Sequence, residues 1–268
     1  MQIILVHRVS ADYAMLLAEL RSVDVDRAPA KCAQMEKALS PESILPRQQP
    51  ADRAGKYKVC GKALSLLRRS QPVMLEKWTP VYIEGDGNCM FRAVSQAVFG
   101  TQDLHLQLRL LACLEVGNHR STYDKTSGRC HELMKRDILV PPSYQEVWNE
   151  ISSVGQACSF VALLALSAVL KCRIGSFFPP LQSAFVSPLT MEIVGRSVTA
   201  SCQSISVMWS TLSAVPDEGP VDINHIVTLQ RRRQEGAVQP SQLTTTAPKS
   251  LPKIDDIASA VDVNCEGN

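Results

Sequence analysis

The apolar positions are most regular directly after the segment EGDGNC, which runs from Glu84 to Cys89. Apolar residues follow at positions 90, 91, 94, 97 and 98, so they recur at i, i+1, i+4, i+7 and i+8. This period is typical of one face of a helix that packs on a core. Gly100 is then the residue type that most often ends a helix in the left-handed conformation. The pattern predicts a helix that begins next to Cys89 and ends at Gly100.

Other helices and strands are indicated by the same kind of pattern. Ser143 and Glu146 have the spacing of a capping box, which marks a helix start. Gly117 is predicted to end another helix. Helices and strands mix without a regular βαβ repeat, and this favours the α+β class. The predicted helices span 103–116, 143–151 and 159–170, and the predicted strands span 81–83, 173–178, 205–209 and 224–229.

The chain divides into three predicted parts. Residues 1–77 are an N-terminal extension, partly helical at 13–20 and 60–69, with a linker at 41–55 that is rich in proline and polar residues. Residues 78–232 carry the periodic signals and form the predicted domain. Residues 233–268 are rich in Gln, Ser, Thr and Pro, and we predict a disordered tail there.

Composition narrows the classes of protein. Apolar residues make up 45% of the 268 residues, which suits a globular core, and the net charge is only +2. So mild a charge argues against nucleic acid or an anionic membrane as a partner. The longest apolar run, 157–170, is shorter than the about 18 residues of a membrane span, so we predict a buried helix there.

Cysteine usage and the N-terminus bear on location. The nine cysteines are an odd number without the spacing of a disulfide framework, and the apolar run at 3–6 is too short for a secretory signal. We therefore expect a reduced intracellular protein, cytoplasmic or nuclear. We also expect a monomer with no cofactor and no bound metal. A zinc site at Cys113, His119, Cys130 and His131 is a minor alternative, because the spacing fits no compact finger.

Cys89 stands where a helix start favours thiol chemistry. A helix N-terminus carries partial positive charge, which stabilises a thiolate, and its free backbone N–H groups point outward. The glycines in GDGNC let the loop fold back tightly. The N–H groups of Asp86 and Cys89 are then candidates to stabilise a developing oxyanion.

A thiol nucleophile needs a base, and His225 is the candidate. It lies well downstream, on a short predicted strand that follows a loop containing Pro216, Gly219 and Pro220. A cysteine near a helix start and a histidine on a distant strand are typical of papain-like proteases. A neutral imidazole there can take the thiol proton and return it to a leaving amine.

These segments resemble the ovarian-tumour (OTU) family of cysteine proteases. GDGNCMFRAVSQAVFG (85–100) is similar to its active-site segment, and NHIVTL (224–229) is similar to its histidine motif. SFVALLALSAVLKCRIGSFFP (159–179) is similar to its middle pattern, and the middle helix, the VMW strand and the N-terminal extension also resemble vertnin-like proteins. The resemblance implies a papain-like OTU fold, a small central sheet flanked by helices.

The resemblance also implies a function, a thiol-dependent deubiquitinase that hydrolyses isopeptide bonds of ubiquitin conjugates. Its partners would be ubiquitin or polyubiquitin chains. Cys89 would be the nucleophile, His225 the general base and acid, and Asp86 would supply an oxyanion-hole N–H.

One position departs from the family pattern. Many members have Asp or Asn two residues after the histidine to orient the imidazole, and this chain has Val227. Asp222 and Asn224 are nearby, but the residue next to a strand histidine points to the other face, so the orienting residue is unassigned. The alternative function is therefore a catalytically degenerate OTU domain that binds ubiquitin or another protein. A domain derived from a mobile element or regulatory locus is a third hypothesis.

Overall fold

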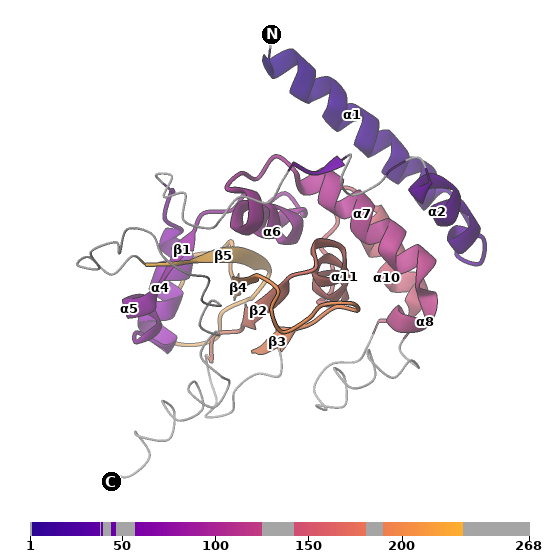
Figure 1. The fold of residues 1–268 in the computed structure, drawn as a ribbon. Coiled ribbons are helices and arrows are strands. Elements are labelled where there is room, and N and C mark those ends of the chain that lie inside the picture. The colour runs from indigo at the N-terminus through magenta and orange to yellow at the C-terminus, as the bar shows by residue number, and fades with distance from the viewer. Residues whose placement is uncertain are drawn as a thin grey trace, which may run out of the picture.

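The computed structural model describes residues 2–37, 39, 44–46, 57–124, 142–180 and 190–232, with side chains from residue 12 onward. In this part of the chain a single sheet is covered by helices, and the two kinds of element do not alternate regularly (Figure 1). The predicted α+β class is therefore confirmed.

The sheet has five strands in the order β1-β5-β4-β2-β3. β2 and β4 pair in parallel, and the other neighbours pair antiparallel. β5 is therefore a central strand, between β1 and β4, and it begins at the predicted base. The strands are β1 (Trp78–Val81), β2 (Arg173–Phe177), β3 (Met191–Ile193), β4 (Ser204–Ser210) and β5 (His225–Arg231).

The helices gather around α7, which contacts α1, α2, α6, α10 and α11. α6 also contacts β4 and β5, and α11 contacts β2 and β3, so these two helices lie between α7 and the sheet (Figure 1). α4 contacts β1 and β4. The helices are α1 (Gln2–Arg21), α2 (Ala28–Glu36), α4 (Gly61–Ser70), α5 (Met74–Lys77), α6 (Cys89–Phe99), α7 (His105–Asn118), α8 (Arg120–Tyr123), α10 (Tyr144–Ser152) and α11 (Val161–Leu170).

Local signals explain several element boundaries. Gly100 ends α6 with φ 74°, as predicted. Ser143 and Glu146 form both hydrogen bonds of the capping box that begins α10. The prediction that Gly117 ends the preceding helix is wrong, because α7 continues to Asn118. A Cβ on Gly117 would lie 2.3 Å from the Cys32 sulfur, so this glycine lets α2 pack closely on α7.

The N-terminal extension contributes to the main core. Leu17 and Leu20 of α1 and Cys32 of α2 are fully buried in the same cluster as α7. α1 is longer than the predicted stretch at 13–20, and α2 was not predicted. The predicted linker at 41–55 falls almost wholly outside the described residues, and the predicted tail, 233–268, does so entirely. The three-part division of the chain stays a prediction.

The described residues bear on the alternative zinc site and on the question of a membrane span. Cys113 is fully buried inside α7, while Cys130 and His131 lie outside the described residues. Within the described ranges, no three metal-ligating side chains are close enough together to hold an ion. No helix in the same ranges combines the length and the apolar content that crossing a membrane requires.

Candidate active site

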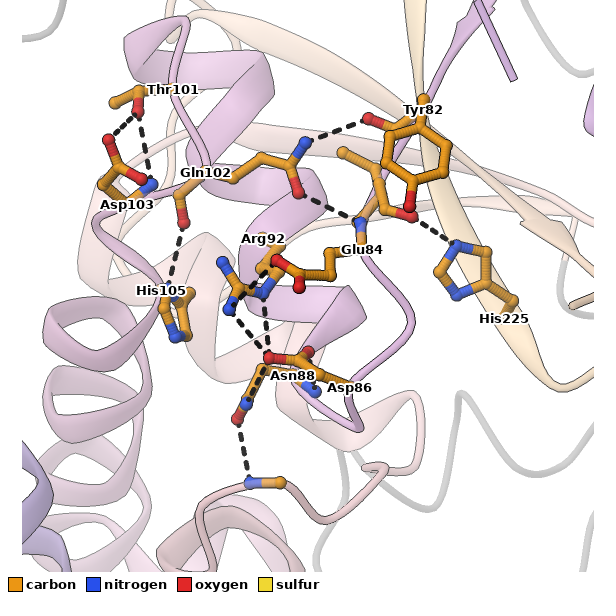
Figure 2. Close-up of polar contacts among 12 residues, drawn as sticks. Tyr82, Glu84, Asp86, Asn88, Arg92, Thr101, Gln102, Asp103, His105 and His225 are labelled. Atoms are coloured by element: carbon orange, nitrogen blue, oxygen red, sulfur yellow. Dashed lines mark hydrogen bonds and ion pairs between the residues drawn. The ribbon is translucent and has the colours of Figure 1, made fainter.

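The loop before α6 is organised by the carboxylate of Asp86. It accepts hydrogen bonds from the Asn88 backbone N–H (2.9 Å), from Asn88 Nδ2 (3.0 Å) and from Arg92 Nη2 (2.7 Å) and Nε (3.1 Å), as Figure 2 shows. Burial acts to raise the pKa of Asp86, but these bonds outweigh it and hold the pKa well below its usual range. The carboxylate is therefore ionised, and it fixes the loop in front of Cys89.

A second loop, after α10, closes on the first one. Gly87 has φ +77°, and a Cβ there would lie 1.7 Å from the carbonyl oxygen of Gly155. Asn88 Oδ1 accepts a hydrogen bond of 3.0 Å from the Gly155 N–H. The glycine at position 87 is thus required twice, by its backbone conformation and by the close approach of Gly155.

Arg109 of α7 ties the two loops together from inside the core. Its side chain is fully buried and its guanidinium lies 4.3 Å from the centre of the Phe91 ring. It donates to backbone carbonyls and to the Cys158 sulfur, and no carboxylate pairs with it among the described residues. The closest acceptors are the carbonyl oxygens of Gly87 (3.1 Å), Glu150 (2.9 Å), Ser153 (2.5 Å) and Gln156 (2.7 Å).

Cys89 is the first residue of α6, as predicted, and only 9% of it is exposed. Burial raises the pKa of its thiol, and hydrogen bonds from the backbone N–H groups of Ile226 and Met90 oppose this only in part. The stabilising effect expected of the helix start is therefore smaller than the effect of burial, and the thiol is the resting form. Desolvation outweighs the helix terminus, so Cys89 needs a base to lose its proton.

His225 is the first residue of β5, and 4% of it is exposed. Its Nε2 lies 3.1 Å from the carbonyl oxygen of Ile83 (Figure 2), while its Nδ1 is buried without a hydrogen-bond partner. A carbonyl oxygen only accepts, so Nε2 carries the hydrogen and Nδ1 keeps its lone pair. Burial lowers the pKa of His225, the Ile83 bond raises it, and the charges of Lys62 and Asp86 act in opposite directions. The ring is neutral at neutral pH.

Packing of α6 on β5 brings Cys89 and His225 into one region. The Thr228 hydroxyl of β5 donates a 2.6 Å hydrogen bond to the Ala93 carbonyl of α6. The Ile226 N–H, which adjoins His225 in the chain, lies against the Cys89 thiol. No hydrogen bond joins Cys89 to the His225 ring, because Nε2 is held by Ile83 and Nδ1 has no partner.

The sequence candidates for the orienting residue are engaged elsewhere. Val227 is fully buried in β5, where it pairs with Met208 of β4. Asn224 uses Oδ1 to accept from the Leu212 N–H (3.0 Å) and Nδ2 to donate to Asp222 (2.8 Å). The contact to the imidazole is instead the Ile83 carbonyl, a backbone group that leaves no signal in the sequence. Arg92 and Arg109 were also missed, and only their place on predicted helices could have suggested a role.

A buried cysteine at a helix start and a neutral histidine at a strand start thus lie in one region of an α+β fold. Residues 80–146 match the family model described as the OTU domain of vertnin. The predicted resemblance to OTU domains, with its vertnin-like features, is thereby confirmed. The matched segment includes the Asp86 loop, all of α6 and all of α7.

Solved OTU structures are similar to the chain at low identity. The OTU domain of OTUD1 is 20% identical with a TM-score of 0.40, and the match covers 62% of this chain and 98% of that one. The viral OTU protease of Dera Ghazi Khan virus is 13% identical with a TM-score of 0.35, covering 59% and 84%. ceOTUB1, in a complex with ubiquitin aldehyde and UBC13~Ub, is 11% identical with a TM-score of 0.36, covering 75% and 98%. A search of curated proteins found no match.

Proposed function

We propose that this chain is a thiol-dependent deubiquitinase with Cys89 as nucleophile and His225 as base. The observation that carries the proposal is that His225, whose Nδ1 is buried with a free lone pair, immediately precedes Ile226, whose backbone N–H bonds the Cys89 thiol. A nucleophile whose pKa is raised and a base whose pKa is lowered form a neutral resting pair. Such a pair is activated only when the proton moves at the moment of attack.

The proposed reaction follows from these two groups. Cys89 gives its proton to Nδ1, and the sulfur adds to the carbonyl carbon of the isopeptide bond. The lysine amine then leaves with the proton from Nδ1, and a thioester remains on Cys89. Water attacks the thioester while Nδ1 takes its proton, and this proton returns to the Cys89 sulfur as the ubiquitin carboxylate leaves.

The loop before α6 is suited to stabilise the oxyanion in both steps. Neither the Asp86 N–H nor the Cys89 N–H donates a hydrogen bond to another residue in the described part of the chain. The bonds from Arg92 and Asn88 to the Asp86 carboxylate hold this backbone still. Donors fixed in advance stabilise a developing charge without the cost of reorganisation. We assign the oxyanion hole to these two N–H groups.

The ubiquitin part of the proposal rests on the OTU resemblance of residues 80–146. A ubiquitin probe with a C-terminal thiol-reactive group tests the nucleophile and the substrate together. Wild type should form a covalent adduct, whereas Cys89→Ala and His225→Ala should not. Cys202 provides the matched control, because it is partly exposed and its pKa is lowered by hydrogen bonds from Thr199. Cys202→Ser should react like wild type.

Two results would contradict the proposal. If the adduct persists in Cys89→Ala and disappears in Cys202→Ser, the probe is trapping an accessible thiol outside the site. If folded wild type forms no adduct but still binds ubiquitin, the domain is a binding module. If wild type does form the adduct, cleavage of a panel of diubiquitins gives the linkage preference of the enzyme.

A further inference from the structure

The side chain of Gln102 forms hydrogen bonds with the backbone on both sides of Ile83. Its Nε2 donates to the Tyr82 carbonyl (3.0 Å), and its Oε1 accepts from the Glu84 N–H (3.1 Å). Figure 2 shows both bonds, with the Ile83 carbonyl directed to His225 from the same segment. One amide side chain thus pairs with the 82–84 segment as the backbone of a neighbouring strand would.

The Ile83 side chain is buried in the core, but the backbone of this segment has few other hydrogen bonds. β1 ends at Val81, so residues 82–84 lie beyond its pairing with β5. The Tyr82 N–H donates to the Lys58 carbonyl (2.7 Å), which holds only the beginning of the segment. Core packing holds the Ile83 side chain, and Gln102 bonds the backbone polar groups on both sides of it, including the N–H of the peptide whose carbonyl meets the imidazole.

Gln102 itself stands on a fixed loop. α6 ends at Gly100 in the left-handed conformation, and the Ser95 hydroxyl of α6 donates to the Thr101 carbonyl (2.6 Å). The loop is thus anchored to the same helix that begins with Cys89. Both members of the proposed catalytic pair are therefore positioned by α6. Cys89 is its first residue, and His225 is connected to it through Ile83 and Gln102.

We propose that Gln102 is a positioning residue, which aims the Ile83 carbonyl at His225 Nε2 and so selects the tautomer with a free Nδ1. In this chain the Ile83 carbonyl, held in place by the two hydrogen bonds of Gln102 (the Gln102 clamp), takes the role of the acidic or amide residue that is absent at Val227. The inference deepens the proposed function and rests on it, since an aimed Nδ1 matters for chemistry only if His225 is the base. The clamp and the tautomer can nevertheless be measured without any reaction.

Nitrogen-15 NMR of the full chain labelled at histidine tests the tautomer directly, because each ring nitrogen reports whether it carries the hydrogen. The chain has five histidines, and the spectrum of His225→Gln assigns the signals of His225. Wild type should show Nε2 protonated and Nδ1 unprotonated. Gln102→Ala should show a mixture of tautomers. Gln145→Ala is the matched control: it removes a glutamine amide that bonds Asn149 on the exposed face of α10, and it should keep the wild-type spectrum.

The rate of reaction with the ubiquitin probe provides a second measurement. Complete loss of the correct tautomer costs about 10⁴-fold in serine proteases. A loosened but still present carbonyl should cost less, about 10- to 100-fold, in Gln102→Ala, with Gln145→Ala unchanged. Gln102→Glu can accept from the Glu84 N–H but cannot donate to the Tyr82 carbonyl, so its rate should fall between those of wild type and Gln102→Ala. It also replaces Gln102→Ala if that variant fails to fold.

The two proposals fail in different ways. If wild type is unreactive but has Nε2 protonated and loses this preference in Gln102→Ala, the deubiquitinase proposal falls and the clamp stands. If wild type has Nδ1 protonated, the clamp is wrong whatever the reactivity. If Gln102→Ala keeps both the tautomer and the rate of wild type, Gln102 has no positioning role.

Discussion

Arg109 holds two loops at the candidate site, and replacing it by methionine should loosen both. Methionine has a similar length and can fill the same buried space beside Phe91, so the change removes the hydrogen bonds more than the packing. The four N–H groups of Nη1 and Nη2 match four close carbonyl acceptors, and one of these belongs to the Cys89 loop.

The magnitude follows from opposing contributions. Hydrogen bonds from a charged donor contribute at least about 1.5 kcal/mol each, so the set contributes about 6 kcal/mol. Burying a guanidinium with no carboxylate beside it costs several kcal/mol, roughly half of that sum. Burial accordingly lowers the pKa of Arg109. The net loss of unfolding free energy in Arg109→Met should be about 3 kcal/mol.

Urea unfolding followed by circular dichroism measures this loss, and Arg120→Met is the matched control. Arg120 is an arginine in an exposed ion pair with Asp26, so its replacement should cost less than about 1 kcal/mol. The probe reaction of Arg109→Met should also slow, because the Gly87 carbonyl loses its donor. If Arg109→Met is no less stable than Arg120→Met, Arg109 does not hold the loops.

Three further perturbations test the packing of the Gly87 loop, the titration of His225 and the cap of α10. Gly87→Ala should cost about 3 kcal/mol or more in chemical unfolding, since its Cβ would meet the Gly155 carbonyl, whereas Gly100→Ala, with φ +74° and open space, should cost about 1 kcal/mol. The lowered pKa of His225 means that the unfolded chain binds more protons below about pH 6.5. Stability should therefore fall as the pH drops through that range, by up to about 1.4 kcal/mol per pH unit, and His225→Gln should lose this part of the slope. Ser143→Ala should cost about 1 kcal/mol by removing the cap of α10, and an unchanged thermal midpoint would contradict this.

The elements that sequence predicts well are those with a local signal. The helix after Cys89 has a clear apolar face and a glycine at its end, and α10 has its capping box. β3 (Met191–Ile193) was missed because three residues cannot display an alternating pattern. Gly117 shows the opposite error, since a glycine that permits close helix packing looks the same in sequence as a glycine that ends a helix.

The candidate site likewise has features that the sequence shows and features that only the fold shows. Asp86, Cys89 and His225 are recognisable as candidates because the segments around them have a motif. Helix position is visible in sequence while burial is not, so the sequence indicated the stabilising helix start of Cys89 but not the desolvation that raises the pKa of its thiol. Desolvation depends on which segments pack near the thiol, and one of them, β5 with Ile226, lies far along the chain.

The contact to His225 shows why a missing side chain is weak grounds for calling a site degenerate. A motif records side chains only, so Val227 looks like the loss of an orienting group. In the fold, orientation requires an acceptor at the correct distance from Nε2, and the Ile83 carbonyl lies there at 3.1 Å. The one side chain in this arrangement is Gln102, which bonds the backbone on both sides of Ile83. In the sequence it stands next to a predicted helix end and far from the histidine, so nothing marks it as part of the site. Comparing the tautomer of His225 in wild type and Gln102→Ala therefore bears on whether a Val227 domain can be an enzyme at all.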